Sequence, residues 1–442
     1  MSAPETVSLV IKARWIAPVV PENRVFEHCA LIVDKGVIRA LVPQEEADKR
    51  FDAEQTIFLG NHLLTPGLVN AHGHAAMSLL RGLADDLPLK TWLEQYIWPT
   101  ENRWVNEDMV RDGTELAMAE MIRSGTTCFS DMYFFPGQAA QAAQQAHMRA
   151  HIHFPVFDMP SAWGQDAEDY LRKGLSLHDD FRAHPLVRVG FGPHAPYTAS
   201  DDTLKRVATL AQELDAPIQI HLHETAQEVT DSLNEHGKRP SQRLAELGLL
   251  SPLTQCVHMT QVDDSDVRLL SEHGAHVVHC PESNLKLASG FCPVQRLLDE
   301  GINVALGTDG AASNNDLSLL GEMKTAALLA KAVAGRADAL DAHGALRMAT
   351  LNGARALGLE DRIGSLEVGK SADVIAVELS DLSSQPIYNP VSQLVYTDSS
   401  HRVSHAWVAG KALLLSRQLQ TLNERELIGK ARWWAKQIGN QR

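Results

Sequence analysis

Strand-like and helix-like segments alternate eight times between Leu63 and about Gly307. Short apolar or β-branched runs separate longer stretches that carry apolar residues at helical spacing. Eight strands, each followed by a helix, over about 250 residues are what a (β/α)8 TIM barrel requires, so we predict an α/β fold of this kind. The expected strands are Leu64–Asn70, Thr126–Met132, His151–Val156, Val187–Phe191, Ile218–Leu222, Gln255–His258, Val277–His279 and Val304–Leu306.

The segments on either side of this region have a different pattern. Ser8–Phe58 alternates short β-like runs with turns, and Val403–Val408 and Gly410–Leu415 predict two more strands joined by a tight turn. The simplest architecture inserts the barrel into a small composite β-sandwich domain. The expected limits are residues 1–62 for the N-terminal part of the sandwich, 63–364 for the barrel with a helix over Leu346–Ala356, and 365–442 for the C-terminal part with a terminal helix over Glu424–Ile438.

Charge and cysteine usage exclude several classes of protein. The 55 acidic residues outnumber the 40 Lys and Arg residues, and the net charge of −15 disfavours nucleic acid and anionic membranes as partners. The charge-free run Thr56–Leu80 is interrupted by Asn, His and Pro residues, which argues against a membrane span. The five cysteines form no CxxC pair, and the N-terminus lacks the pattern of a secretory signal. We therefore expect a cytoplasmic protein.

Side chains that bind metals follow four of the expected strands, at the end where barrel enzymes gather their functional groups. Residues two apart in an extended segment point to the same face, so both imidazoles of His72 and His74 can reach one ion. The candidates are His72 and His74 at the end of the first strand, His221 and Glu224 at the end of the fifth, His258 at the end of the sixth and Asp309 at the end of the eighth.

Three imidazoles and one carboxylate suit a zinc or iron ion with one position left for water, whose pKa the ion lowers toward neutrality. Glu224 is a candidate to move the proton of that water, and His258 is a candidate to orient the water. Taken singly, a His-x-His pair is common by chance and Asp309 could cap a helix. It is improbable that metal-binding residue types would occur by chance at the ends of four strands of one predicted barrel.

Three motifs together resemble the amidohydrolase superfamily, and within it the branch of 5′-methylthioadenosine/S-adenosylhomocysteine deaminases. They are Thr65–His74, His221–Glu224 and Gly307–Asn315. The resemblance implies that His72, His74, His221 and Asp309 are the metal ligands, that Glu224 is the proton shuttle, and that His258 faces the water. Relatives with two metals bridge them through a Lys on strand four, and Val187–His194 has none, which favours a single divalent ion. Zinc is the expected metal and iron the alternative.

The same resemblance implies a nucleoside pocket. Trp92 would line it, Glu101 would hold the ribose hydroxyls, His194 would contact the sugar, and Glu224 would contact the base. A carboxylate suits a vicinal diol because it accepts two O–H donors. Without the resemblance, Glu101 would indicate the first turn of a helix and Trp92 would indicate core packing.

The reaction implied is hydrolytic deamination at C6 of a 6-aminopurine nucleoside, with release of ammonia. Phe154 occupies the position at which relatives that take S-adenosylhomocysteine can place an Arg, which favours 5′-methylthioadenosine over S-adenosylhomocysteine; adenosine is a further candidate. The alternatives are an amidohydrolase acting on guanine-like bases, pterins or triazines, and, from another class, a non-catalytic scaffold. The resemblance also implies a homo-oligomer.

Overall fold

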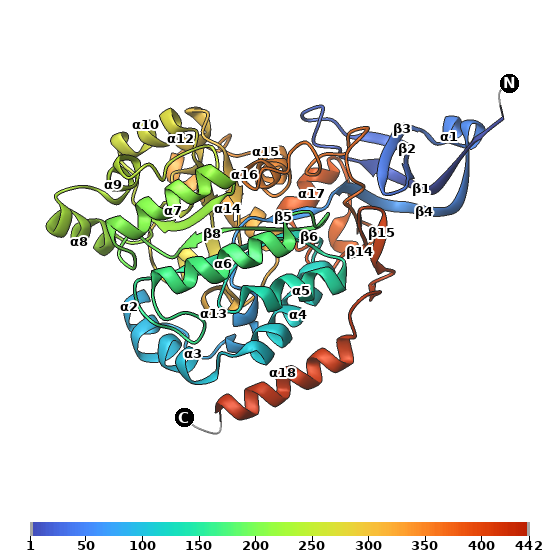
Figure 1. The fold of residues 1–442 in the computed structure, drawn as a ribbon. Coiled ribbons are helices and arrows are strands. Elements are labelled where there is room, and N and C mark those ends of the chain that lie inside the picture. The colour runs from blue at the N-terminus through green and yellow to red at the C-terminus, as the bar shows by residue number, and fades with distance from the viewer. Residues whose placement is uncertain (1–2, 440–442) are drawn as a thin grey trace.

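Residues 3–439 are described by the computed structural model, and eight of their strands form a parallel barrel (Figure 1). The strands follow chain order around the barrel, and the Ala71 amide donates to the Leu306 carbonyl over 2.9 Å, which joins the last strand to the first. This confirms the predicted TIM barrel. The strands are β5 (Leu68–Asn70), β6 (Thr126–Met132), β7 (Arg149–Val156), β8 (Val187–Pro193), β9 (Ile218–Leu222), β10 (Thr254–His258), β11 (His276–His279) and β12 (Val304–Leu306).

Helices surround the barrel and bury its outward-facing side chains. Several begin at a polar side chain that accepts a backbone N–H of the first turn, as Asn106 does from Met109 and Ser200 from Thr203. The helices include α4 (Glu107–Arg123), α5 (Pro136–Ala146), α6 (Ala167–Phe181), α7 (Asp201–Leu214), α8 (Ala226–His236), α9 (Pro240–Glu246), α10 (Asp264–His273), α12 (Val294–Asp299) and α14 (Leu319–Ala334). No helix within residues 3–439 is long and apolar enough to cross a bilayer.

Two expected elements are divided in the structure. The expected strand Leu64–Asn70 is split at Gly67, because its first residues complete β4 (Phe51–Pro66) in the other sheet and only the last three enter the barrel as β5. The expected helix Leu346–Ala356 is broken into α15 (Ala342–Met348) and α16 (Leu351–Ala356). The break is at Thr350, whose backbone leaves the helical region at φ −131° and ψ −90°.

The two terminal segments of the chain meet in the second sheet. Its order is β16-β15-β14-β13-β4-β1-β2-β3, and β4 pairs antiparallel with β13 with Leu63 opposite Val377. This confirms that the N-terminal and C-terminal segments form one composite β-domain. Hydrogen bonds join its eight strands in a single sheet. The remaining strands are β1 (Glu5–Ile16), β2 (Phe26–Asp34), β3 (Val37–Pro43), β13 (Val374–Glu378), β14 (Val403–Val408), β15 (Lys411–Leu415) and β16 (Gln418–Leu419). The limits at residues 62 and 364 stay a prediction.

Two long-range contacts tie the terminal segments to the barrel. The buried Arg149 of β7 donates from Nε to Oδ2 of Asp373 over 2.8 Å, and Asp373 is the residue directly before β13. The C-terminal helix α18 (Glu424–Gly439) runs beside α4 (Figure 1), and Trp434 Nε1 donates to Asp112 of α4 over 3.0 Å. These contacts hold the β-domain and the last helix against the barrel.

Candidate active site

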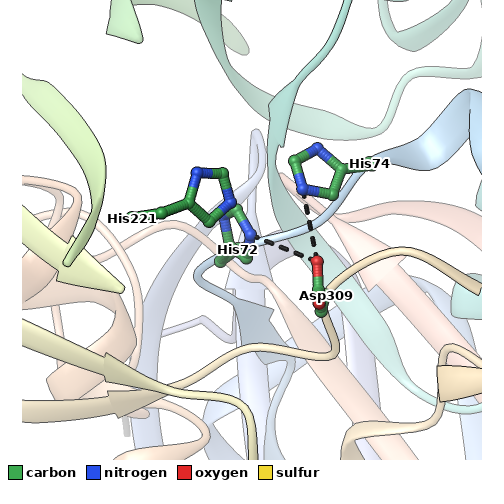
Figure 2. Close-up of side chains that lie close together, drawn as sticks. All are labelled: His72, His74, His221 and Asp309. Carbon is green, nitrogen blue, oxygen red and sulfur yellow. Dashed lines mark ion pairs between the residues drawn. The ribbon is translucent and has the colours of Figure 1, made fainter. Parts of the chain in front are cut away.

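Four side chains at the ends of three barrel strands converge at one point (Figure 2). The ligand atoms of His72, His74, His221 and Asp309 all lie within 4.8 Å of one another. Asp309 Oδ1 lies 3.4 Å from Nε2 of His72 and 3.2 Å from Nε2 of His74. The structure therefore brings together the four residues expected as ligands, at the C-terminal ends of β5, β9 and β12.

Each of the three histidines is held through Nδ1 by an oxygen atom. His72 Nδ1 lies 2.7 Å from Gln219 Oε1, His74 Nδ1 lies 2.6 Å from the Met132 carbonyl, and His221 Nδ1 lies 2.7 Å from the His194 carbonyl. A carbonyl oxygen only accepts, so Nδ1 carries a proton in each ring, and in the neutral ring Nε2 carries the lone pair.

Asp309 is fixed just as firmly. Its Oδ2 accepts hydrogen bonds from the Ser283 and Ser313 hydroxyls over 2.6 and 2.7 Å, and its Oδ1 accepts from the Gly310 amide over 2.8 Å. The backbone of Asp309 has a φ of +61°, which is unfavourable for a non-glycine residue. Such strained conformations are common at functional sites.

The donor set fits a divalent ion. His72 Nε2 is buried and has no hydrogen-bond partner, and Nε2 of both His72 and His74 faces Oδ1 of Asp309. Against the effect of burial, the hydrogen bond and the charge of Asp309 raise the pKa of His74 to about 9. A nitrogen lone pair and a carboxylate oxygen at this distance need a proton or a metal ion between them. Three neutral imidazoles and a carboxylate are typical ligands of zinc and iron.

Glu224 and His258 lie beside this group. Glu224 Oε1 is 3.9 Å from His258 Nε2, and His258 Nδ1 is held by Asn284 Oδ1 over 2.8 Å. The backbone amide of Glu224 donates to Glu228 Oε2 over 2.7 Å, which fixes the turn between β9 and α8. Burial, together with the charge of Asp309, raises the pKa of Glu224 to about 8, and burial lowers the pKa of His258. Burial therefore favours the protonated form of Glu224 over its carboxylate.

A cavity of about 220 Å³ opens over these residues. Trp92, Glu101 and His194 line it together with Glu224, so the pocket residues expected from the sequence share one cavity with the metal-ligand group. Much of its wall is aromatic or aliphatic. That wall includes Leu89, Trp98, Phe134, Phe157, Met159, Tyr170 and Leu287.

The polar residues of the pocket are held by their neighbours. Glu101, in α3 (Trp98–Trp104), accepts a hydrogen bond from the Tyr133 hydroxyl over 2.6 Å. Burial raises the pKa of Glu101 to about 7. His194 stacks on Phe157 with ring centroids 5.1 Å apart, and burial lowers its pKa to about 3, so its ring is neutral.

Phe154 does not line the cavity, so it cannot carry the argument about substrate preference made from the sequence. It is fully buried, its ring centroid lies 4.8 Å from that of Phe191, and its ring fills the space beside Gly174 of α6. The preference must rest on the side chains that do line the cavity.

Sequence reasoning missed Gln219, Asn284 and Tyr133. A signal exists for Gln219, because it precedes His221 by two residues in one strand and so shares its face. Asn284 and Tyr133 belong to segments after β11 and β6, and nothing in their local sequence shows which partner they meet. Their positions depend on how separate strands come together.

A parallel barrel whose strand ends carry three histidines, an aspartate and a buried glutamate over one cavity is typical of metal-dependent hydrolases. Residues 63–413 match the model of the amidohydrolase family, and the chain belongs to this family.

Curated relatives and one solved structure are similar over nearly the whole chain. A 5-methylthioadenosine/S-adenosylhomocysteine deaminase of Saccharophagus degradans is 60% identical over 98% of this chain and 97% of its own. A protein of the same name from Teredinibacter turnerae is 55% identical over 100% of both chains. The crystal structure of an adenosine deaminase from Xanthomonas campestris with bound zinc has a TM-score of 0.98 and 48% identity, and covers 99% of this chain and 100% of that one.

Proposed function

We propose that the protein is a metal-dependent hydrolase that deaminates 6-aminopurine nucleosides, with 5′-methylthioadenosine as the preferred substrate. One observation carries the proposal: the cavity that holds Glu224 beside the ligand group also holds Glu101 and Trp92, which suit a ribose and a flat base. The names of the two curated relatives and of the zinc-bound structure support the same activity.

One divalent ion held by His72, His74, His221 and Asp309 would activate a water molecule for attack on C6 of the purine. Zinc is favoured, since the similar adenosine deaminase was solved with zinc, and iron is the alternative. The hydrogen bonds from Nδ1 of each histidine keep its Nε2 available for this role.

Glu224 would take the proton of the attacking water and give it to ring N1, which draws electron density away from C6. Burial favours the protonated form of Glu224, which helps this side chain to hold the proton that it takes from water until N1 receives it. His258, neutral and held by Asn284, would accept a hydrogen bond from the water through Nε2 and orient it together with Asp309.

Glu101 and His194 would orient the nucleoside. One oxygen of Glu101 accepts from Tyr133, and the remaining lone pairs of the carboxylate suit the two ribose hydroxyls. Trp92 and His194 belong to the cavity wall, where they would contact the base and the sugar.

The wall of the cavity supports an uncharged 5′ substituent. No Lys or Arg among residues 3–439 lines it, so the amino-acid carboxylate of S-adenosylhomocysteine would lack a cationic partner. The aromatic and aliphatic side chains would instead receive a methylthio group. S-adenosylhomocysteine and adenosine are expected as weaker substrates.

The test is an ammonia-release assay on zinc-loaded protein, with metal content measured on the same sample. The substrates are 5′-methylthioadenosine, S-adenosylhomocysteine, adenosine, guanine, a pterin and a triazine. We expect the highest kcat/KM for 5′-methylthioadenosine. Release from guanine, the pterin or the triazine but from no nucleoside would assign the alternative hydrolase function, and no activity without bound metal would point to a scaffold.

Two expectations from the sequence stay predictions. The five cysteines are free and buried, which supports a reducing, cytoplasmic compartment. A homo-oligomer is implied by the resemblance and awaits a measurement of mass in solution.

A further inference from the structure

The three histidines of the ligand group differ in what holds them. His74 and His221 are held by main-chain carbonyls, of Met132 and His194. His72 is held by a side chain, the amide oxygen of Gln219, over 2.7 Å. Among the three, His72 therefore depends on an oxygen that a substitution can remove.

Gln219 lies in β9, is completely buried, and has its amide group fixed by other contacts. Its Nε2 lies 2.9 Å from the Ala71 carbonyl, 2.7 Å from Gln255 Oε1 and 3.1 Å from Ser130 Oγ. Because a carbonyl oxygen only accepts, Nε2 must face Ala71 and Oε1 must face His72. If the Gln219 amide were flipped by 180°, its Nε2–H would face the Nδ1–H of His72, and two donors would meet.

We propose that Gln219 is a positioning residue that fixes the tautomer and the ring orientation of His72, and thereby sets the affinity of the site for its metal ion. The inference rests on the metal site of the proposed function and not on its substrate. Partners behind metal-bound histidines typically change metal affinity by about 10–100-fold when they are removed.

The chemistry of the pocket requires an amide at this position. A glutamate would keep an acceptor toward His72, but its second oxygen would face the Ala71 carbonyl and Gln255 Oε1, so that acceptors would meet without a proton between them. A methionine of similar length would fill the space and offer no acceptor to His72.

The test compares Gln219→Met with Gln255→Met, using zinc alone and a competing chelator at fixed pH. Gln255 is equally buried and takes part in the same hydrogen bond, but its side chain forms no hydrogen bond with His72, His74, His221 or Asp309, so it controls for loss of interior polarity. We expect the zinc Kd to rise about 10–100-fold in Gln219→Met and less than about threefold in Gln255→Met. An unchanged Kd in Gln219→Met, or an equal rise in both variants, would overturn the inference.

A second variant keeps the inference testable if Gln219→Met does not fold. Gln219→Asn retains the amide but withdraws it by one methylene from His72. The histidines of this variant are labelled with nitrogen-15, and the His72 signal is assigned by comparison with His72→Gln. In the metal-free variant, His72 should no longer show the NMR signature of a single Nδ1–H tautomer. Zinc should also bind more weakly. A wild-type His72 signal with wild-type zinc affinity in Gln219→Asn would contradict the role. Neither readout depends on deaminase activity.

Discussion

The Tyr133 hydroxyl donates a hydrogen bond of 2.6 Å to Glu101 Oε1, and both side chains are buried in the wall of the cavity. Burial raises the pKa of Glu101 to about 7, against the lowering effects of the Tyr133 hydrogen bond and of the charge of His74. In the proposed function the carboxylate would accept both ribose hydroxyls above this pH, and below it the neutral acid would lose acceptor capacity.

The preference for a ribose should therefore depend on pH. We expect the ratio of kcat/KM between 5′-methylthioadenosine and its 2′,3′-dideoxy analogue to be largest above pH 7 and to fall as the pH drops through about 7. In Tyr133→Phe the hydrogen bond that lowers the pKa is lost, so the transition should move to higher pH. A ratio that does not change across this pH range would contradict the assignment of Glu101 as the residue that binds the ribose.

Replacement of Glu224 should remove turnover and leave the metal site intact. Glu224→Gln keeps the size of the side chain but cannot carry a proton from water to N1. We expect kcat to fall by about 10²–10⁴-fold, the usual contribution of a general acid–base group. Elemental analysis should show metal content equal to that of the parent protein. Near-normal kcat in this variant would remove Glu224 from the proton transfer.

Loss of one ligand should release the ion. His72 Nε2 is buried beside Asp309, and His72→Ala leaves two imidazoles and a carboxylate. We expect metal content well below one ion per chain after dialysis, together with loss of ammonia release. Glu224→Gln is the matched control, because it lies beside the same group and should retain metal. Stoichiometric metal in His72→Ala would contradict the assignment of the ligands.

A cation placed in the cavity wall should change the substrate preference. Met159 lines the cavity and is 47% exposed, so a longer charged side chain can be accommodated there. Met159→Arg should raise kcat/KM for S-adenosylhomocysteine relative to 5′-methylthioadenosine by up to about fivefold, as expected for a partly exposed ion pair. Met159→Gln, which is polar but uncharged, should leave the ratio near that of the parent. An equal change in both variants would refute the charge argument.

The ion pair between the barrel and the β-domain should matter for stability. Arg149 and Asp373 are each about 2% exposed, so Arg149→Leu leaves a buried carboxylate without its partner. We expect the free energy of unfolding to drop by about 3–5 kcal/mol in urea titrations. The exposed pair Arg123–Glu424 is the control, and Arg123→Leu should cost less than about 1 kcal/mol. Similar losses in both variants would contradict the argument from burial.

The barrel and the ligand group could be predicted because each has a local signal in the sequence. Strands and helices alternate with distinct periods, and the spacing of His72 and His74 places two imidazoles on one face of an extended segment. Only the last residues of β4 have a strand signal in the sequence. Its middle is polar and exposed, so its pairing with β1 and β13 defines that part as a strand.

The error over Phe154 has a physical cause. Side chains of a strand alternate between its two faces, and His153 of β7 faces the barrel interior, where its Nδ1 lies 3.1 Å from Ser130 Oγ. Phe154 therefore points outward, against Gly174 of α6. The inferred preference for an uncharged substituent survives, but its support comes from Phe157, Met159 and the other side chains of the cavity wall.

The central claim is tested most directly by identifying the product that zinc-loaded protein forms from 5′-methylthioadenosine in water labelled with oxygen-18. We predict the 6-oxo nucleoside with one labelled oxygen at C6 and one equivalent of ammonia, at a rate that Glu224→Gln abolishes. A fully metal-loaded protein that leaves the nucleoside unchanged, or that cleaves it elsewhere than at C6, would contradict the account.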